Sequence, residues 1–187
     1  MKQVMLLMHV SLDGFVAGPN GEMDFITFDD AQFDFVGTLT EQADTALYGR
    51  KTYEMMEPYW PTADQQPNAT NHAKNHAAWY RKSLKLVISN SLQTGGENSR
   101  IISGDIVKKM HAEKQQGGSN ILMIGSPSTT HLFTNAELID HYWLFVNPVI
   151  LGAGIPLFKD VKSMQKLKLL ETKTFATGVV GLHYEKA

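Results

Sequence analysis

The chain has 187 residues, of which 43% are hydrophobic, and this is enough apolar material for the core of one domain. Its net charge of −2 at pH 7 lacks the basic surplus of nucleic-acid-binding proteins, so we expect no nucleic-acid partner. The sequence contains no cysteine, which excludes disulfides, thiolate catalysis and cysteine-ligated zinc.

The first apolar segment, Gln3 to Val10, predicts a strand covered on both faces, because its apolar residues do not alternate with polar ones. The segment is too short for a signal sequence with a cleavage site, and too short to span a bilayer. We therefore expect a cytoplasmic protein that does not associate with membranes.

Helical and extended patterns alternate along the rest of the chain. Helices are predicted over residues 29–41, 50–56, 104–116 and 128–135, and strands over 45–48, 84–89, 120–124 and 137–149. In the first helix, Phe33, Val36, Gly37 and Thr40 share one face. The polar segment Pro58 to Asn75 predicts an inserted surface loop that leads into a short helix.

The last two extended segments, residues 166–174 and 179–185, flank Thr177 and Gly178 and predict a hairpin. This order of elements predicts a single α/β domain over residues 1–187. Helices would cover both faces of a mostly parallel sheet, a three-layer αβα arrangement with antiparallel strands at the C-terminus.

Ligands of such sheets bind at the carboxyl ends of the strands, which points to the loops after residues 10, 48, 89, 124 and 149. Gly49-Arg50-Lys51-Thr52 and Gly125-Ser126-Pro127-Ser128-Thr129 each open a helix with free amides and hydroxyls, which suits phosphate groups. Each motif alone is more often an ordinary helix start. Together, on neighbouring strands, they predict a dinucleotide such as NADPH.

Several motifs resemble the reductase domain of the riboflavin-biosynthesis deaminase-reductase family, and most of all its free-standing members within the dihydrofolate-reductase-like superfamily. The resemblance covers nearly the whole chain in the right order. It is carried by Ser11-Leu12-Asp13-Gly14, Tyr48 to Tyr53, Leu86 to Ser89, Met123 to Ser126, and Pro148 to Phe158.

The resemblance implies a dihydrofolate-reductase-like fold and an NADPH site assembled from several loops. Val16 and Ala17 would lie near the nicotinamide, and Ser89 and Asn90 beside the adenosine ribose. The phosphates would be held from two sides by Gly49, Arg50, Lys51, Thr52, Gly125, Ser126, Ser128 and Thr129.

Three carboxylates are candidates for donating a proton to the reduced substrate. In the superfamily, a carboxylate at the start of the first long helix often contacts a pterin-like substrate, and Asp29 and Asp30 are the nearest matches. We place Asp30 first, with Asp29 and Asp13 as alternatives. Two acids at a helix start are equally well explained by capping and the helix dipole.

The sequence departs from the family pattern in two places. Gly125-Ser126 replaces a Gly-Gly pair, and the Pro-Trp element of folate reductases is missing around Met23 to Phe25. The predicted function is therefore NADPH-dependent reduction of a small heterocycle, either a riboflavin-precursor aminouracil or a pterin-like compound. The alternative is an NADPH-binding protein with little or no turnover.

Two further expectations concern partners and metals. By resemblance we expect a homodimer that associates through the strand region 137–149. His72 and His76 lie four residues apart on a helix and could share a metal ion, but no third ligand is evident. We expect a solvated helix face there and no metal. His9 is expected to be a core histidine, and the alternative is a contact with the substrate.

Overall fold

The computed structural model describes residues 1–187. The elements follow one another as β1 (Val4–Ser11), β2 (Phe15–Ala17), α1 (Asp30–Thr40), β3 (Ala43–Gly49), α2 (Arg50–Met56), the 3-10 helix η1 (Trp60–Gln65), α3 (Asn71–Lys82), β4 (Leu84–Ile88), β5 (Ser99–Ile102), α4 (Ile106–Lys114), β6 (Asn120–Ile124), α5 (Pro127–Asn135), β7 (His141–Asn147), β8 (Ile155–Pro156), β9 (Leu167–Thr174) and β10 (Val180–Lys186).

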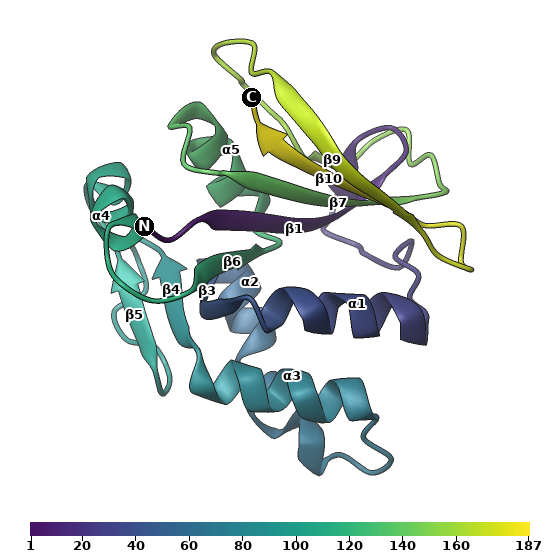
Figure 1. The fold of residues 1–187 in the computed structure, drawn as a ribbon, viewed down its shortest axis with the longest axis horizontal. Coiled ribbons are helices and arrows are strands. Elements are labelled where there is room, and N and C mark those ends of the chain that lie inside the picture. Colours follow the sequence, from purple (N-terminus) through teal and green to yellow (C-terminus); the bar gives the residue numbers. More distant parts are fainter.

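The central sheet has the strand order β5-β4-β3-β6-β1-β7-β10-β9 (Figure 1). The strands from β5 to β7 are parallel to their neighbours, whereas β10 is antiparallel to both β7 and β9. The predicted fold class, a mostly parallel sheet with antiparallel C-terminal strands, is confirmed.

The sheet is covered on both faces because its inner strands are apolar on both sides. Val4, Leu6 and Met8 of β1 belong to a cluster that includes Met110 of α4 and Phe133 of α5. The alternate residues Met5 and Leu7 belong to a second cluster with Leu39 of α1. In Figure 1, α1 and α3 lie on one side of the sheet, and α4 and α5 lie on the other.

The polar segment after α2 is more ordered than predicted. It contains η1, and α3 begins at Asn71 and runs for 12 residues to Lys82. Thr70 caps this helix, because its hydroxyl accepts a hydrogen bond from the amide of Ala73. The short strands β2, β5 and β8 were not predicted from the sequence, since each has four residues or fewer.

The prediction of one strand over residues 137–149 is wrong. Glu137 adopts a left-handed backbone conformation with φ 54°, and Pro148 has no amide to donate to a neighbouring strand. The strand is therefore limited to β7, His141–Asn147. It lies between β1 and β10, so both of its edges are already paired within the chain.

The predicted ligand-binding loops follow five strands that are adjacent in the sheet, namely β4, β3, β6, β1 and β7. Because these strands are parallel, the loops gather along one edge of the sheet. None of the helices has the length and apolar character that crossing a membrane would need.

Candidate active site

A cavity of about 630 Å³ opens beside the carboxyl ends of β1 and β6. This volume lies within the range of about 300–1,000 Å³ that small-molecule sites occupy. Its lining comes from β1, β2, α1, α2, η1, α3, β6 and the loops between them. The cavity is therefore built by elements that are distant in the sequence and meet only in the folded chain.

One wall of the cavity joins the two predicted phosphate motifs. Lys51 and Thr52 from the first turn of α2 line it together with Gly125 and Ser126, which precede α5. The amide of Gly49 donates a hydrogen bond of 2.7 Å to the Ser126 hydroxyl, and this bond links the two loops. An ammonium, two hydroxyls and nearby backbone amides form a donor set that fits an anionic dinucleotide.

Ser126 has an unusual backbone at this junction. Its φ of 67° is left-handed, a conformation that glycine adopts more easily than serine. The preceding Gly125 also has a positive φ, of 62°. Two left-handed residues in succession turn the chain sharply from β6 into α5, which places the Ser126 hydroxyl against α2.

Val16 and Ala17 of β2 both line the cavity. Strand β2 is held there by antiparallel pairing with β8. A side chain at Gly154, just before β8, would place its Cβ 2.2 Å from the carbonyl oxygen of Ala17. Only a glycine allows this close approach, which explains how the Pro148–Phe158 motif positions Val16 and Ala17.

The other residues predicted to bind the cofactor do not line the cavity. Thr129 is buried, and its hydroxyl would lie 2.7 Å from a Cβ on Gly49. Arg50 forms an exposed ion pair with Glu54, and Ser128 is exposed. Ser89 accepts hydrogen bonds from the amides of Ser91 and Leu92, and the exposed Asn90 accepts one from Gly104.

The three predicted catalytic carboxylates lie outside the cavity lining. Asp13 accepts hydrogen bonds from the Ser11 hydroxyl and from the amides of Leu151 and Gly152. The bond from Ser11, followed by those from the amides, lowers the pKa of Asp13, so this carboxyl stays ionised and is a poor proton donor. It instead anchors the loop after β7 to the loop after β1.

Asp29 caps α1, because its carboxylate accepts a hydrogen bond of 2.7 Å from the amide of Gln32. Asp30 is exposed in the first turn of the same helix. Two carboxylates do line the cavity, Asp34 one turn further along α1 and Glu41 at the C-cap of this helix. Asp34 lies four residues after Asp30, on the same face of the helix, so helical spacing could have identified Asp34 as a candidate from the sequence.

The predicted inner face of α1 lines this cavity. Phe33, Val36, Gly37 and Thr40 all contribute to its wall. Phe33 stacks on His72 of α3 with ring centres 4.1 Å apart, and on Phe28 at 4.8 Å. The periodic pattern of this helix therefore identified residues that line the cavity as well as residues that pack in the core.

The prediction of a solvated histidine face on α3 is wrong. His72 packs against Phe33, and His76 lies 4.0 Å from the Trp60 ring, centre to centre. Burial lowers the pKa of His76 to about 4. Both histidines line the cavity because α3 packs beside α1.

His9 is only half-buried, and it lines the cavity. Its ring lies between Phe28 and Phe145, at centroid distances of 4.8 and 5.1 Å. Burial lowers the pKa of His9 to about 4, so the imidazole is neutral near pH 7.

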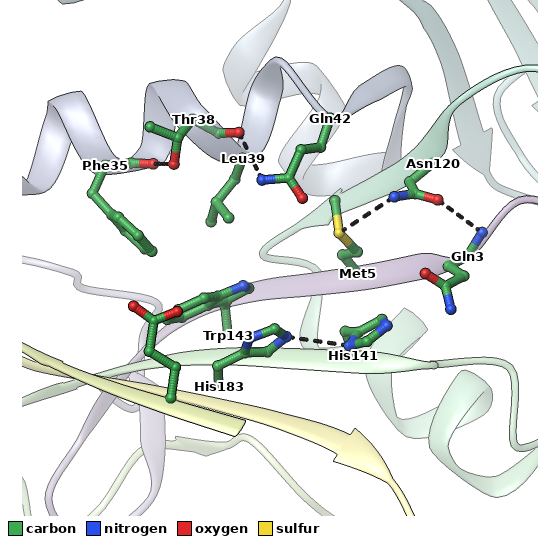
Figure 2. A pocket seen from close by; sticks show the side chains of 11 residues that line it. Gln3, Met5, Phe35, Thr38, Leu39, Gln42, Asn120, His141, Trp143 and His183 are labelled. Atoms are coloured by element: carbon green, nitrogen blue, oxygen red, sulfur yellow. Dashed lines mark hydrogen bonds between the residues drawn. The ribbon is translucent and has the colours of Figure 1, made fainter. Parts of the chain in front are cut away.

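A second hollow, of about 410 Å³, lies near the amino ends of β1, β6 and β7. Figure 2 shows Phe35, Thr38 and Leu39 of α1, with Gln42 just after this helix, facing His141, Trp143 and His183 of the sheet. His141 and His183 are hydrogen-bonded at 3.2 Å. This hollow lies away from the predicted ligand loops, so the larger cavity is the candidate active site.

The model of the RibD C-terminal domain family matches residues 2–181. The chain belongs to this family. The Bacillus subtilis (strain 168) protein YyaP is similar to this chain in sequence. It is 34% identical over 183 residues, which are 98% of this chain and 94% of YyaP.

Solved structures share the fold of this RibD C-terminal domain. A protein from Shewanella sp. PV-4 superimposes with a TM-score of 0.73 at 22% identity, covering 100% of this chain and 99% of that one. A Thermotoga maritima diaminohydroxyphosphoribosylaminopyrimidine deaminase/5-amino-6-(5-phosphoribosylamino)uracil reductase gives a TM-score of 0.66 at 17% identity. This chain is fully covered there but spans only 57% of that longer protein.

Proposed function

We propose that the chain is an NADPH-dependent oxidoreductase that reduces a small heterocyclic compound, either a riboflavin-precursor aminouracil or a pterin-like substrate. Family membership supports a reductase of the riboflavin-pathway type. The observation that carries the proposal is the single cavity that joins Val16 and Ala17 to Lys51, Thr52, Gly125 and Ser126.

The chain's own part in this reaction is binding and positioning. Lys51 and the hydroxyls of Thr52 and Ser126 would bind the phosphates, while Val16 and Ala17 would pack against the nicotinamide. When bound, NADPH supplies a hydride. The protein then has to align the substrate with that hydride donor and keep bulk water away from both.

A proton must also reach the reduced substrate, and Asp34 is the best-placed carboxyl for this role. It lines the cavity, whereas Asp13, Asp29 and Asp30 do not. Asp34 makes no side-chain hydrogen bond or ion pair within the chain, so its carboxyl group is free to contact a substrate directly or through one water molecule.

NADPH binding is the first test, measured by the fluorescence of the reduced nicotinamide. We expect Lys51→Ala to weaken binding by about tenfold, because a charged hydrogen bond to phosphate contributes about 1.5–3 kcal/mol. Lys74→Ala removes an exposed lysine outside the cavity lining and is the matched control. Failure of the native protein to bind NADPH would refute the proposal.

Turnover is the second readout of the same experiment. NADPH oxidation is followed with aminouracil, pterin and flavin compounds, first with the native protein and then with Asp34→Asn. We expect the variant to lose most of its kcat and to retain NADPH affinity. Binding without oxidation by any compound would favour an NADPH-binding protein without turnover.

A further inference from the structure

The hollow of about 410 Å³ near the amino ends of β1, β6 and β7 contains a pair of histidines that the proposed reaction does not use. His141 lies on β7 and His183 on the neighbouring strand β10, and Figure 2 shows their rings directed toward one another. The atoms His141 Nδ1 and His183 Nε2 are 3.2 Å apart. Both side chains are half-buried and line the hollow, so a small ligand can reach the pair.

The spacing of these two nitrogens suits a shared metal ion. Imidazole nitrogens bind Zn²⁺ at about 2.0–2.1 Å, so two of them in a tetrahedral site lie about 3.3–3.4 Å from each other. The 3.2 Å between His141 and His183 is close to that spacing. A metal ion would replace the proton that the two rings share in their hydrogen bond, and its binding requires only a rotation of the rings.

The sheet holds both rings in this arrangement. Strands β7 and β10 are antiparallel, and His183 lies opposite Trp143, two residues after His141. The buried Trp143 ring stacks on the His183 ring with centres 4.3 Å apart. Burial, followed by the neighbouring His141, lowers the pKa of His183, so this ring is neutral near pH 7 and offers a lone pair to a metal ion.

A carboxylate lies next to the histidine pair. Glu171 of β9 is directly opposite His183 and lines the same hollow. Cross-strand neighbours have Cβ atoms about 4.5–5.5 Å apart, which allows their side chains to share a ligand. Glu171 is exposed and forms no ion pair, whereas Glu185, opposite His141, is paired with Lys168. No three acidic or histidine side chains are assembled for a metal in the chain as it stands, so Glu171 has to turn toward the histidines when the ion binds.

We propose that His141 and His183 bind Zn²⁺ or a similar divalent transition metal, with Glu171 as the third protein ligand and water completing the coordination. Two imidazoles and one carboxylate are a ligand set that Zn²⁺ accepts, and imidazole nitrogens also suit Ni²⁺ and Cu²⁺. The ion would join β7, β10 and β9, the antiparallel part of the sheet. The site is separate from the candidate active site, and the inference does not depend on the proposed reductase function.

The test is a calorimetric titration of the tag-free, chelator-treated protein with zinc chloride, in which we expect one ion to bind per chain. His141→Ala and His183→Ala should each weaken binding by about 100-fold or more, because losing even an outer-shell partner of a ligand costs about 10–100-fold. His111→Ala removes an exposed histidine of α4 outside the hollow and is the matched control. Its Zn²⁺ affinity should equal that of the native protein.

Variants of Glu171 test the third ligand without removing a half-buried side chain. Glu171→Gln should weaken Zn²⁺ binding by about tenfold, because an amide is a poorer ligand than a carboxylate. Glu171→His supplies an imidazole instead and should restore the affinity to within about threefold of the native value. Co²⁺ serves as a spectroscopic probe. The strong visible absorption of tetrahedral Co²⁺ should appear with the native protein and with Glu171→His, and should be lost in His183→Ala.

Thermal denaturation provides an independent readout. Zn²⁺ should raise the Tm of the native protein and of His111→Ala, because it binds the folded chain, and should not raise the Tm of His183→Ala. Failure of the native protein to bind Zn²⁺ stoichiometrically would overturn the inference. Binding that persists in both histidine variants would overturn it as well, since the ion would then lie elsewhere. Equal affinity of Glu171→Gln and the native protein would exclude Glu171 as a ligand.

Discussion

Ser126 shows how one residue couples two segments of the site. Its hydroxyl accepts a hydrogen bond from Gly49, and its backbone is left-handed. A left-handed conformation costs a residue with a side chain about 1–2 kcal/mol. The hydrogen bond offsets part of that cost, which explains how a serine can occupy a position that suits glycine.

We predict that Ser126→Ala lowers the free energy of unfolding by about 1 kcal/mol, because the Gly49 amide loses its partner while the backbone strain remains. Ser126→Gly loses the same bond but relieves the strain. It should therefore be less destabilising than Ser126→Ala by about 0.5–1 kcal/mol, even after the added flexibility of the unfolded chain. Urea denaturation of both variants measures the difference, and the opposite order would show that the backbone is unstrained.

Helix α1 serves the site as an element. Its first turn is fixed by the Asp29 cap, and its second turn places Phe33 and Asp34 in the cavity. The direction of a helix side chain depends on where the helix begins. The Asp29 cap therefore has a structural role that affects the position of the Asp34 side chain. Of the two explanations that the sequence left open for the paired acids, the cap at Asp29 supports the structural one.

We predict that Asp29→Ala lowers the free energy of unfolding by about 1 kcal/mol, the usual effect of losing a helix cap. Asp30→Ala should lower it by only about 0.3 kcal/mol, since Asp30 is exposed and interacts only with the helix dipole. Thermal or chemical denaturation of the two variants tests the assignment. Equal effects would contradict a capping role that is specific to Asp29.

At the scale of the whole molecule, the sheet ends in β9, whose outer edge is unpaired. This strand has eight residues, and its Leu167, Leu169 and Leu170 are exposed. A long edge strand with exposed apolar side chains favours association with another chain. We therefore propose that the expected homodimer forms through β9, because both edges of β7 are already occupied.

Sedimentation velocity provides the measurement for this association. The native chain should sediment as a dimer, and Leu169→Lys should shift it toward the monomer by placing a charge on the edge strand. Lys173→Ala on the same strand is the control, because the Lys173 ammonium already packs over the ring of Phe35 within the chain. A native protein that remains monomeric at high concentration would contradict the proposal.

Local patterns in the sequence predicted most elements of the sheet and its helices. The apolar runs of β1, β4 and β6 and the periodicity of α1 reflect burial, which acts on nearby residues. The short strands β2 and β8 escaped prediction because two or three residues carry no periodic signal, and they pair only after the chain returns on itself. The start of the strand expected over 137–149 depended on the backbone conformation of Glu137.

The sequence by itself determined the fold class, the family motifs and the set of loops that could bind a dinucleotide. Only the tertiary structure decided which carboxylates line the cavity, and it brought together His9, Phe28, Phe33 and His72 as one aromatic row. The physical reason is that strand and helix patterns depend on near neighbours. The cavity instead depends on how α1, α2 and α3 pack on the same face of the sheet, and no single segment encodes that arrangement.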